Sequence, residues 1–105
     1  MHVQVVNFQL TGIDDAAFRE LCDQLAPNFA DVGGLISKVW LASPETGTYG
    51  GVYQWRDRAD MEAYSRGDLF KAVLSHPNFA NITSRDFGVL EGPTAVTHGL
   101  PMARV

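Results

Sequence analysis

Cysteine is almost absent from this sequence. Cys22 is the only cysteine among 105 residues, which excludes an intrachain disulfide and any metal site built on paired cysteines. We interpret Cys22 as a small buried residue of a helix rather than a nucleophile. Histidine is scarce as well. His2, His76 and His98 stand far apart without paired carboxylates, so we predict no metal site.

The sequence also lacks long apolar runs and basic clusters. No run approaches the roughly 18 residues of a membrane span, and the first residues lack the pattern of a signal peptide, so we expect a cytoplasmic protein. The net charge is −4 and the eight Lys and Arg residues are scattered, which argues against nucleic-acid binding. No glycine-rich phosphate loop and no Ser-His-Asp arrangement stand out either.

The most informative stretch runs from Gly33 to Trp55. Two segments rich in aliphatic, β-branched and aromatic residues flank Ser-Pro-Glu-Thr-Gly-Thr, in which Pro44 and Gly47 favour a turn. This pattern predicts an antiparallel hairpin of two long strands. Alternation places Lys38 and Trp40 on one face of the first strand, with Leu35 and Val39 on the other. Neither face is polar, so both must be covered.

The rest of the chain supplies two helices and two strands. We expect a strand from His2 to Leu10, a helix from Asp14 or Asp15 that Pro27 ends or distorts near Ala26, and a helix from Asp57 to His76 that breaks at Gly67. A fourth strand is expected over 81–91. The resulting order, strand-helix-strand-strand-helix-strand, is that of an α+β, ferredoxin-like βαββαβ domain with a four-stranded antiparallel sheet. We place this domain at 1–92 and an extended C-terminal tail at 93–105.

Two helices can cover only one face of such a sheet. The other face keeps apolar residues on its first and central strands, and a bare patch of that kind is unusual in a monomer. A second copy packed sheet against sheet would cover it. We therefore predict a homodimer.

Two short motifs carry a resemblance to a known family. Lys38-Val39-Trp40 followed by Gly50-Gly51-Val52-Tyr53, with the strand around Arg85-Asp86-Phe87-Gly88, resembles the YdhR-type monooxygenases. These belong to the dimeric α+β barrel superfamily, together with antibiotic-biosynthesis monooxygenases. The resemblance implies two sheets closing across a dimer and a pocket between sheet and helices in each subunit. It also implies oxidation of a small aromatic, phenolic or quinol-type molecule by O₂ without a flavin or metal cofactor.

The resemblance directs attention to residues that could form such a pocket. If the hairpin pairs Lys38 with Tyr53, then Gly51 lies opposite Trp40 and leaves a gap for an aromatic ring, whereas a slip of one residue would send Tyr53 to the other face. Each candidate also has a purely structural alternative. The aromatic residues could pack in the core or in a dimer interface, Arg85 could form an ion pair, and His76 could cap a helix. The candidate catalytic residues are Tyr53, Lys38, Asn7, His76 and Arg85, and the candidate substrate-binding residues are Trp40, Trp55, Tyr64 and Gly51.

Two other functions remain open at this stage. Haem-degrading members of the superfamily have an Asn in the first strand, which Asn7 matches, but Tyr64 stands where they have Trp and Leu74 where they have the His ligand. His76 lies two residues further, about 200° around a helix. The other alternative is a non-catalytic barrel protein that binds a small molecule or has a stress-related role. A cavity with several convergent polar groups would favour an enzyme.

Overall fold

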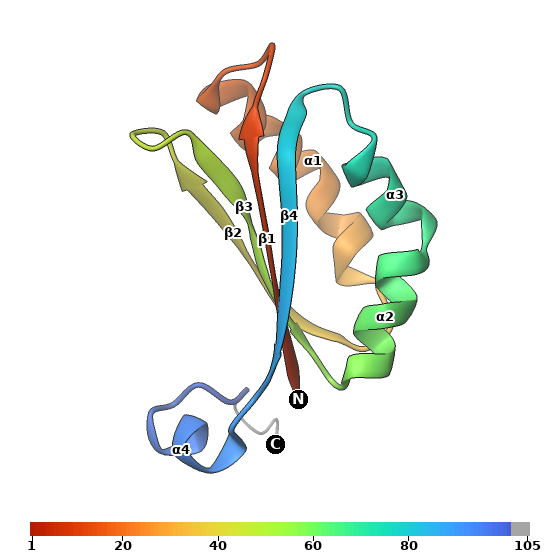
Figure 1. The fold of residues 1–105 in the computed structure, drawn as a ribbon, viewed down its shortest axis with the longest axis vertical. Coiled ribbons are helices and arrows are strands. Elements are labelled where there is room, and N and C mark those ends of the chain that lie inside the picture. Colours follow the sequence, from red (N-terminus) through yellow and green to blue (C-terminus); the bar gives the residue numbers. More distant parts are fainter. Residues whose placement is uncertain (102–105) are drawn as a thin grey trace.

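The computed structural model describes residues 1–101, and its element order confirms the ferredoxin-like prediction (Figure 1). Neighbouring strands are antiparallel and lie in the order β2-β3-β1-β4. The elements are β1 (His2–Leu10), α1 (Asp15–Ala30), β2 (Leu35–Ser43), β3 (Thr48–Trp55), α2 (Arg58–Arg66), α3 (Asp68–Leu74), β4 (Phe79–Gly88) and α4 (Glu91–Val96). None of the helices within residues 1–101 is both long enough and apolar enough to cross a membrane.

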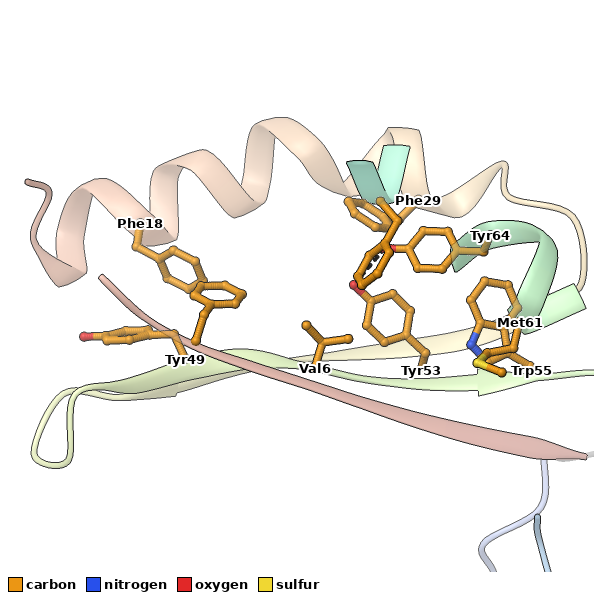
Figure 2. Packing of buried hydrophobic residues seen from close by; sticks show 10 residues of the cluster. Val6, Phe18, Phe29, Tyr49, Tyr53, Trp55, Met61 and Tyr64 are labelled. Carbon is orange, nitrogen blue, oxygen red and sulfur yellow. Dashed lines mark hydrogen bonds between the residues drawn. The ribbon is translucent and has the colours of Figure 1, made fainter. Parts of the chain in front are cut away.

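Three helices form one layer against one face of the sheet. Figure 1 shows α1, α2 and α3 on the same side, while only the short α4 lies on the other side, at one end of the sheet, where its segment borders Val3, Gln54 and Phe87. Alternation along β1 matches this arrangement, because His2, Gln4, Val6 and Phe8 are buried under the helices and the residues between them are only partly buried. Figure 2 shows the aromatic core that fills the space between the two layers.

Local sequence signals explain where the helices begin and break. The Asp14 carboxylate accepts a hydrogen bond from the Ala17 amide at 2.8 Å, and Asp57 caps α2 in the same way through Asp60 at 2.9 Å. The break predicted at Gly67 is confirmed, since its extended ψ of 170° separates α2 from α3. Gly67 itself is the N-cap of α3, so Asp68 lies in the first turn and does not cap it.

We expected Pro27 to end or distort the first helix near Ala26, and it does not end the helix there. Helix α1 continues through Pro27 to Ala30. Pro27 lacks a backbone N–H group, so one hydrogen bond within the helix is lost, while the other backbone hydrogen bonds can still form. The extra turn carries Phe29 into the core, where its side chain is only 3 % exposed, and the burial of this ring offsets the lost hydrogen bond.

The hairpin register is confirmed: Lys38 pairs with Tyr53 and Trp40 with Gly51. The assignment of Leu35 to the face opposite Lys38 is wrong. A register shift between Leu35 and Ser37 inserts one extra residue, so that Leu35 pairs with the buried Trp55 and packs against the core. Periodicity alone cannot show such a bulge, because one inserted residue reverses the face of everything beyond it.

The C-terminal segment also differs from the prediction. Strand β4 spans Phe79–Gly88 rather than 81–91, and Glu91–Val96 forms the short helix α4 where we expected an extended tail. Pro93 is compatible with this helix because it lies in the first turn, where backbone N–H groups have no partner within the helix. The segment is held by Gln54, whose Nε2 donates to the Gly99 carbonyl at 3.2 Å. Residues 102–105 of the predicted tail lie outside the described residues.

Gly50 permits the close pairing of β3 with β1. Its φ is +151°, and a β-carbon there would collide with the Val6 carbonyl oxygen. We therefore expect Gly50→Ala to lower the free energy of unfolding by at least about 3 kcal/mol in urea titrations. Gly88→Ala is the matched control, because nothing lies within 4 Å of its added carbon, and it should change stability by less than about 1 kcal/mol. Equal effects of the two substitutions would contradict this account.

Candidate functional site

The side chain of Lys38 ends inside a box of three aromatic rings. Its Nζ lies 3.4 Å from the centre of the Trp40 ring, 3.5 Å from that of Phe29 and 4.7 Å from that of Tyr53. These rings come from β2, α1 and β3, so the box joins the sheet to the helix layer. Figure 2 shows Phe29 reaching down from α1 beside Tyr53 and Tyr64. We call Lys38 with these three rings the lysine box.

A small cavity adjoins the lysine box. Its volume is about 30 Å³, which is room for one or two water molecules and too little for an aromatic ring. Besides the box it is lined by Phe8, Phe18, Leu21, Cys22, Leu25, Gly50, Gly51, Val73 and Phe79. A β-carbon on Gly51 would lie 2.9 Å from the Lys38 Cε, so the gap predicted opposite Trp40 exists and the lysine chain occupies it.

Two grooves lead from the surface to this cavity, one on either side of Trp40. Both run between α1 and the edge strand β2. The larger, of about 440 Å³, passes Arg19, Cys22 and Asp23, and the smaller, of about 310 Å³, passes Phe29 and Lys38. Trp40 lines both grooves and the cavity. Trp40 therefore separates the cavity from both grooves.

Burial changes the acidity of Lys38. Loss of contact with water lowers the pKa of its amine from 10.5 to about 7. The negative faces of the three rings attract the ammonium form and work in the opposite direction. Among residues 1–101 no carboxylate forms a salt bridge with it. A substantial fraction of this amine is therefore unprotonated at neutral pH, which is unusual for lysine.

Tyr53 contributes a hydroxyl group to the box. Tyr64 donates a hydrogen bond to the Tyr53 oxygen at 3.2 Å (dashed in Figure 2), which leaves the Tyr53 O–H free to donate. Burial raises the pKa of Tyr53 to about 12, and it also raises the pKa of Tyr64. Both phenols are therefore protonated at neutral pH. Tyr53 can act there as a hydrogen-bond donor and not as a base.

Trp55 and Tyr64 contact Tyr53 but do not line the cavity. Trp55 is fully buried, and its Nε1 donates to the Gln4 side-chain oxygen at 3.1 Å. Its ring stacks on Tyr53 with centroids 6.0 Å apart. Neither Trp55 nor Tyr64 borders the cavity. We assign them to packing and to the orientation of Tyr53.

The structure separates three of the candidate residues from the lysine box. Asn7 and Arg85 lie on the other face of the sheet, where they border a shallow groove with Val5 and Phe87. His76 follows the end of α3; its ring stacks on Phe79 with centroids 4.3 Å apart, and its Nδ1 accepts a hydrogen bond from the Asn78 amide. These residues cannot act on the same small molecule as Lys38 within one chain.

Phe29 and Cys22 border the site, although neither was among the candidate site residues. A helix that ended near Ala26, as Pro27 suggested, would not have included Phe29. Cys22 faces the cavity, and burial raises the pKa of its thiol. Within residues 1–101 no three His, Cys, Asp or Glu side chains gather in a way that could hold a metal ion.

Comparison with known proteins identifies the family of this chain. Residues 3–100 match the model of the family described as "Putative mono-oxygenase ydhR". The chain belongs to this family. The family resemblance inferred from the Lys-Val-Trp and Gly-Gly-Val-Tyr motifs is thereby confirmed. No protein with a curated description matches the sequence.

Solved structures share the fold at low sequence identity. The NE2512 protein of unknown function from Nitrosomonas europaea superimposes with a TM-score of 0.74 at 15% identity, covering 97% of this chain and 95% of that one. The haem degrader MhuD from Mycobacterium tuberculosis has a TM-score of 0.70 at 15% identity (86% and 96% covered). SnoaB from Streptomyces nogalater, a cofactor-independent oxygenase, has 0.65 at 19% identity (86% and 94% covered). At these identities the likeness shows the fold alone.

The lowered pKa of Lys38 has a consequence for stability. Between the folded value of about 7 and the unfolded value of 10.5, the unfolded chain binds more protons than the folded chain, so this group makes stability rise with pH in that window. The full difference corresponds to about 5 kcal/mol, and we expect roughly 2–3 kcal/mol because partial contact with water screens the charge.

This expectation is tested by unfolding the native chain and Lys38→Met in urea at pH 6, 7, 8.5 and 10. The difference in unfolding free energy between them should be constant below pH 7 and should shift in favour of the native chain above it. Lys71→Met, which removes an exposed lysine, should show no such shift. A difference that does not vary with pH would mean that Lys38 titrates normally.

Proposed function

We propose that this chain is a monooxygenase that oxidises a small phenolic or quinol-type compound with O₂ and needs no flavin or metal. One observation carries the proposal: an amine that is largely shielded from water, and that has no carboxylate partner among residues 1–101, lies among three aromatic rings, one of which is the phenol ring of Tyr53. Membership of the monooxygenase family supports the reaction class. The lysine box supports a phenolic substrate, because it combines aromatic rings with an amine that could accept a proton.

In this reaction Lys38 is the base. Its neutral amine takes the phenolic proton and becomes an ammonium ion, which then lies beside the phenolate in a site of low polarity. The Tyr53 hydroxyl donates a hydrogen bond to the same anion and stabilises it further. The rings of Phe29 and Trp40 pack against the flat substrate.

The substrate itself supplies the electrons. Deprotonation makes the ring electron-rich enough to react with O₂. One oxygen atom forms a new bond to a ring carbon, and the other leaves as water with electrons and protons from the substrate. An anthrone or naphthol would become a quinone in this way. The protein needs only to bind, deprotonate and shield the anion from bulk water.

A substrate ring must displace part of the box before it can bind. Because the cavity of about 30 Å³ is too small, the Lys38 chain has to withdraw from above Gly51. The grooves on either side of Trp40 provide space for this movement. Binding therefore exchanges contacts between the lysine and the rings for contacts between the substrate and the same rings.

Haem degradation is less well supported by the geometry. No histidine of residues 1–101 lines the cavity, and the position of the expected ligand is held by Leu74, whose side chain is half exposed. His76 is engaged with Phe79 and with the Asn78 amide. A barrel that binds a small molecule without turnover is the stronger alternative, because it needs only the rings.

The proposal includes a homodimer formed through the face of the sheet opposite α1, α2 and α3. Cross-strand pairing puts Val3, Val5, Val39, Val52 and Phe87 on this face, and Val39 and Phe87 are 57 % and 56 % exposed in the single chain. A neighbouring copy would bury this apolar surface. It would also bury Asn7 and Arg85, which suggests that these two residues serve the interface.

The dimer is tested by Val39→Glu, which places a charge on an exposed apolar position of the proposed interface, on the edge strand β2. We expect the native chain to sediment as a dimer and the variant as a monomer at micromolar concentration. Leu74→Glu is the matched control, because Leu74 is similarly exposed at 50 % but lies in the helix layer. A native chain that sediments as a monomer would refute the dimer without affecting the lysine box.

The reaction is tested by O₂ uptake of the metal-free protein with hydroquinones, anthrones and naphthols. We expect uptake well above the uncatalysed rate, a loss of at least about 100-fold in Lys38→Met, and a smaller loss of about 10-fold in Tyr53→Phe. Lys71→Met should retain full activity. No uptake, together with quenching of Trp40 fluorescence by the same compounds, would favour the binding protein. Full activity of Lys38→Met would remove Lys38 from the mechanism.

A further inference from the structure

The chain contains only two lysines, and they lie in opposite environments. Lys38 is enclosed by the rings of Phe29, Trp40 and Tyr53, whereas Lys71 is exposed on α3. An exposed lysine is almost fully protonated at neutral pH and is therefore a weak nucleophile. An amine that is desolvated in an apolar pocket is activated for attack on carbonyl compounds. The two lysines should thus differ sharply in reactivity.

No salt bridge among residues 1–101 engages the Lys38 nitrogen, so an aldehyde has only a ring contact to displace. Cys22 and Phe29 of α1 line the same cavity, as does Tyr53 of β3, whose hydroxyl is hydrogen-bonded to Tyr64 of α2. Arg19 and Asp23 lie further out, along the larger groove. Of these, Arg19 is already paired with Asp15 at 2.6 Å. Nothing in this set forms a salt bridge that would keep the Lys38 amine protonated.

We propose that Lys38 forms an imine with small, flat aryl aldehydes that enter along the groove between α1 and β2 at Trp40. The amine nitrogen adds to the carbonyl carbon, and the carbonyl oxygen becomes the hydroxyl of a carbinolamine. That hydroxyl leaves as water when the C=N bond forms. The step needs no oxidant, reductant or metal, and it goes beyond the oxygenase reaction because O₂ takes no part in it.

The lysine box favours this product in three ways. The aldehyde ring can pack against Trp40 and Phe29, which an aliphatic aldehyde cannot do as well. The protonated imine keeps a positive charge among the faces of the same rings. A bound ring would also fill the apolar cavity and displace the one or two water molecules that it can hold, which slows hydrolysis back to the aldehyde.

The experiment traps the imine on the full chain. The protein is incubated with benzaldehyde and sodium cyanoborohydride at pH 7, and the adducts are located by peptide mapping with mass spectrometry. We expect Lys38 to be labelled at least about tenfold faster than Lys71, since far more of its amine is unprotonated. The N-terminal amine of Met1 is mapped separately. Labelling of Lys38 should level off above pH 7, while that of Lys71 should continue to rise toward pH 10.

Two further comparisons make the test specific. Lys38→Met should lose the adduct and Lys71→Met should retain it, with both variants checked for native circular dichroism. Formaldehyde, which has no ring, should show a much smaller preference for Lys38. Labelling of Lys71 at a rate equal to or above that of Lys38, or absence of a Lys38 adduct, would overturn the proposal. Because the readout is a covalent adduct, a failure here is distinguishable from an absence of O₂ uptake.

Discussion

The desolvation of one amine is the constraint on which the rest of the site depends. Lys38 is placed on the helix-facing side of β2, and the hairpin register then brings Tyr53 directly opposite it. Burial would make a charged lysine costly there, and the three rings around Nζ reduce this cost without providing a counter-ion. The result is an amine with a lowered pKa in surroundings formed by aromatic rings.

The same arrangement links the fold to the proposed chemistry. Phe29 reaches the lysine only because α1 continues past Pro27, and Lys38 has room for its chain only because position 51 is glycine. The hydroxyl of Tyr53 is oriented by Tyr64, which comes from a different helix. The residues of the site therefore come from two helices and two strands, and none of them lies in a loop. The rings are held in place, while the Lys38 chain occupies the space that a substrate ring would need.

Much of this could be predicted from the sequence, and the reasons for success and failure are physical. The turn at Pro44 to Gly47 determines the hairpin register, so the facing of Lys38 with Tyr53 and of Trp40 with Gly51 was predictable. The family was predictable from the motifs on these strands. The bulge near Leu35, the persistence of α1 and the helix α4 were not, because each depends on tertiary packing that overrides a local signal. Separation of Asn7 and Arg85 from the lysine box follows from strand alternation, but only once the pocket is known to lie under the helices.

Strand β2 is the edge of the sheet, and this gives Lys38 a second consequence. An edge strand offers unpaired backbone groups to any other extended chain, and apolar edges of this kind promote aggregation. An inward-pointing lysine on an edge strand opposes such pairing. If the register of β2 shifted to pair with another chain, the ammonium group would lose its ring contacts and remain in an apolar environment. Lys38 thus also helps to keep a strongly apolar hairpin from pairing with other chains.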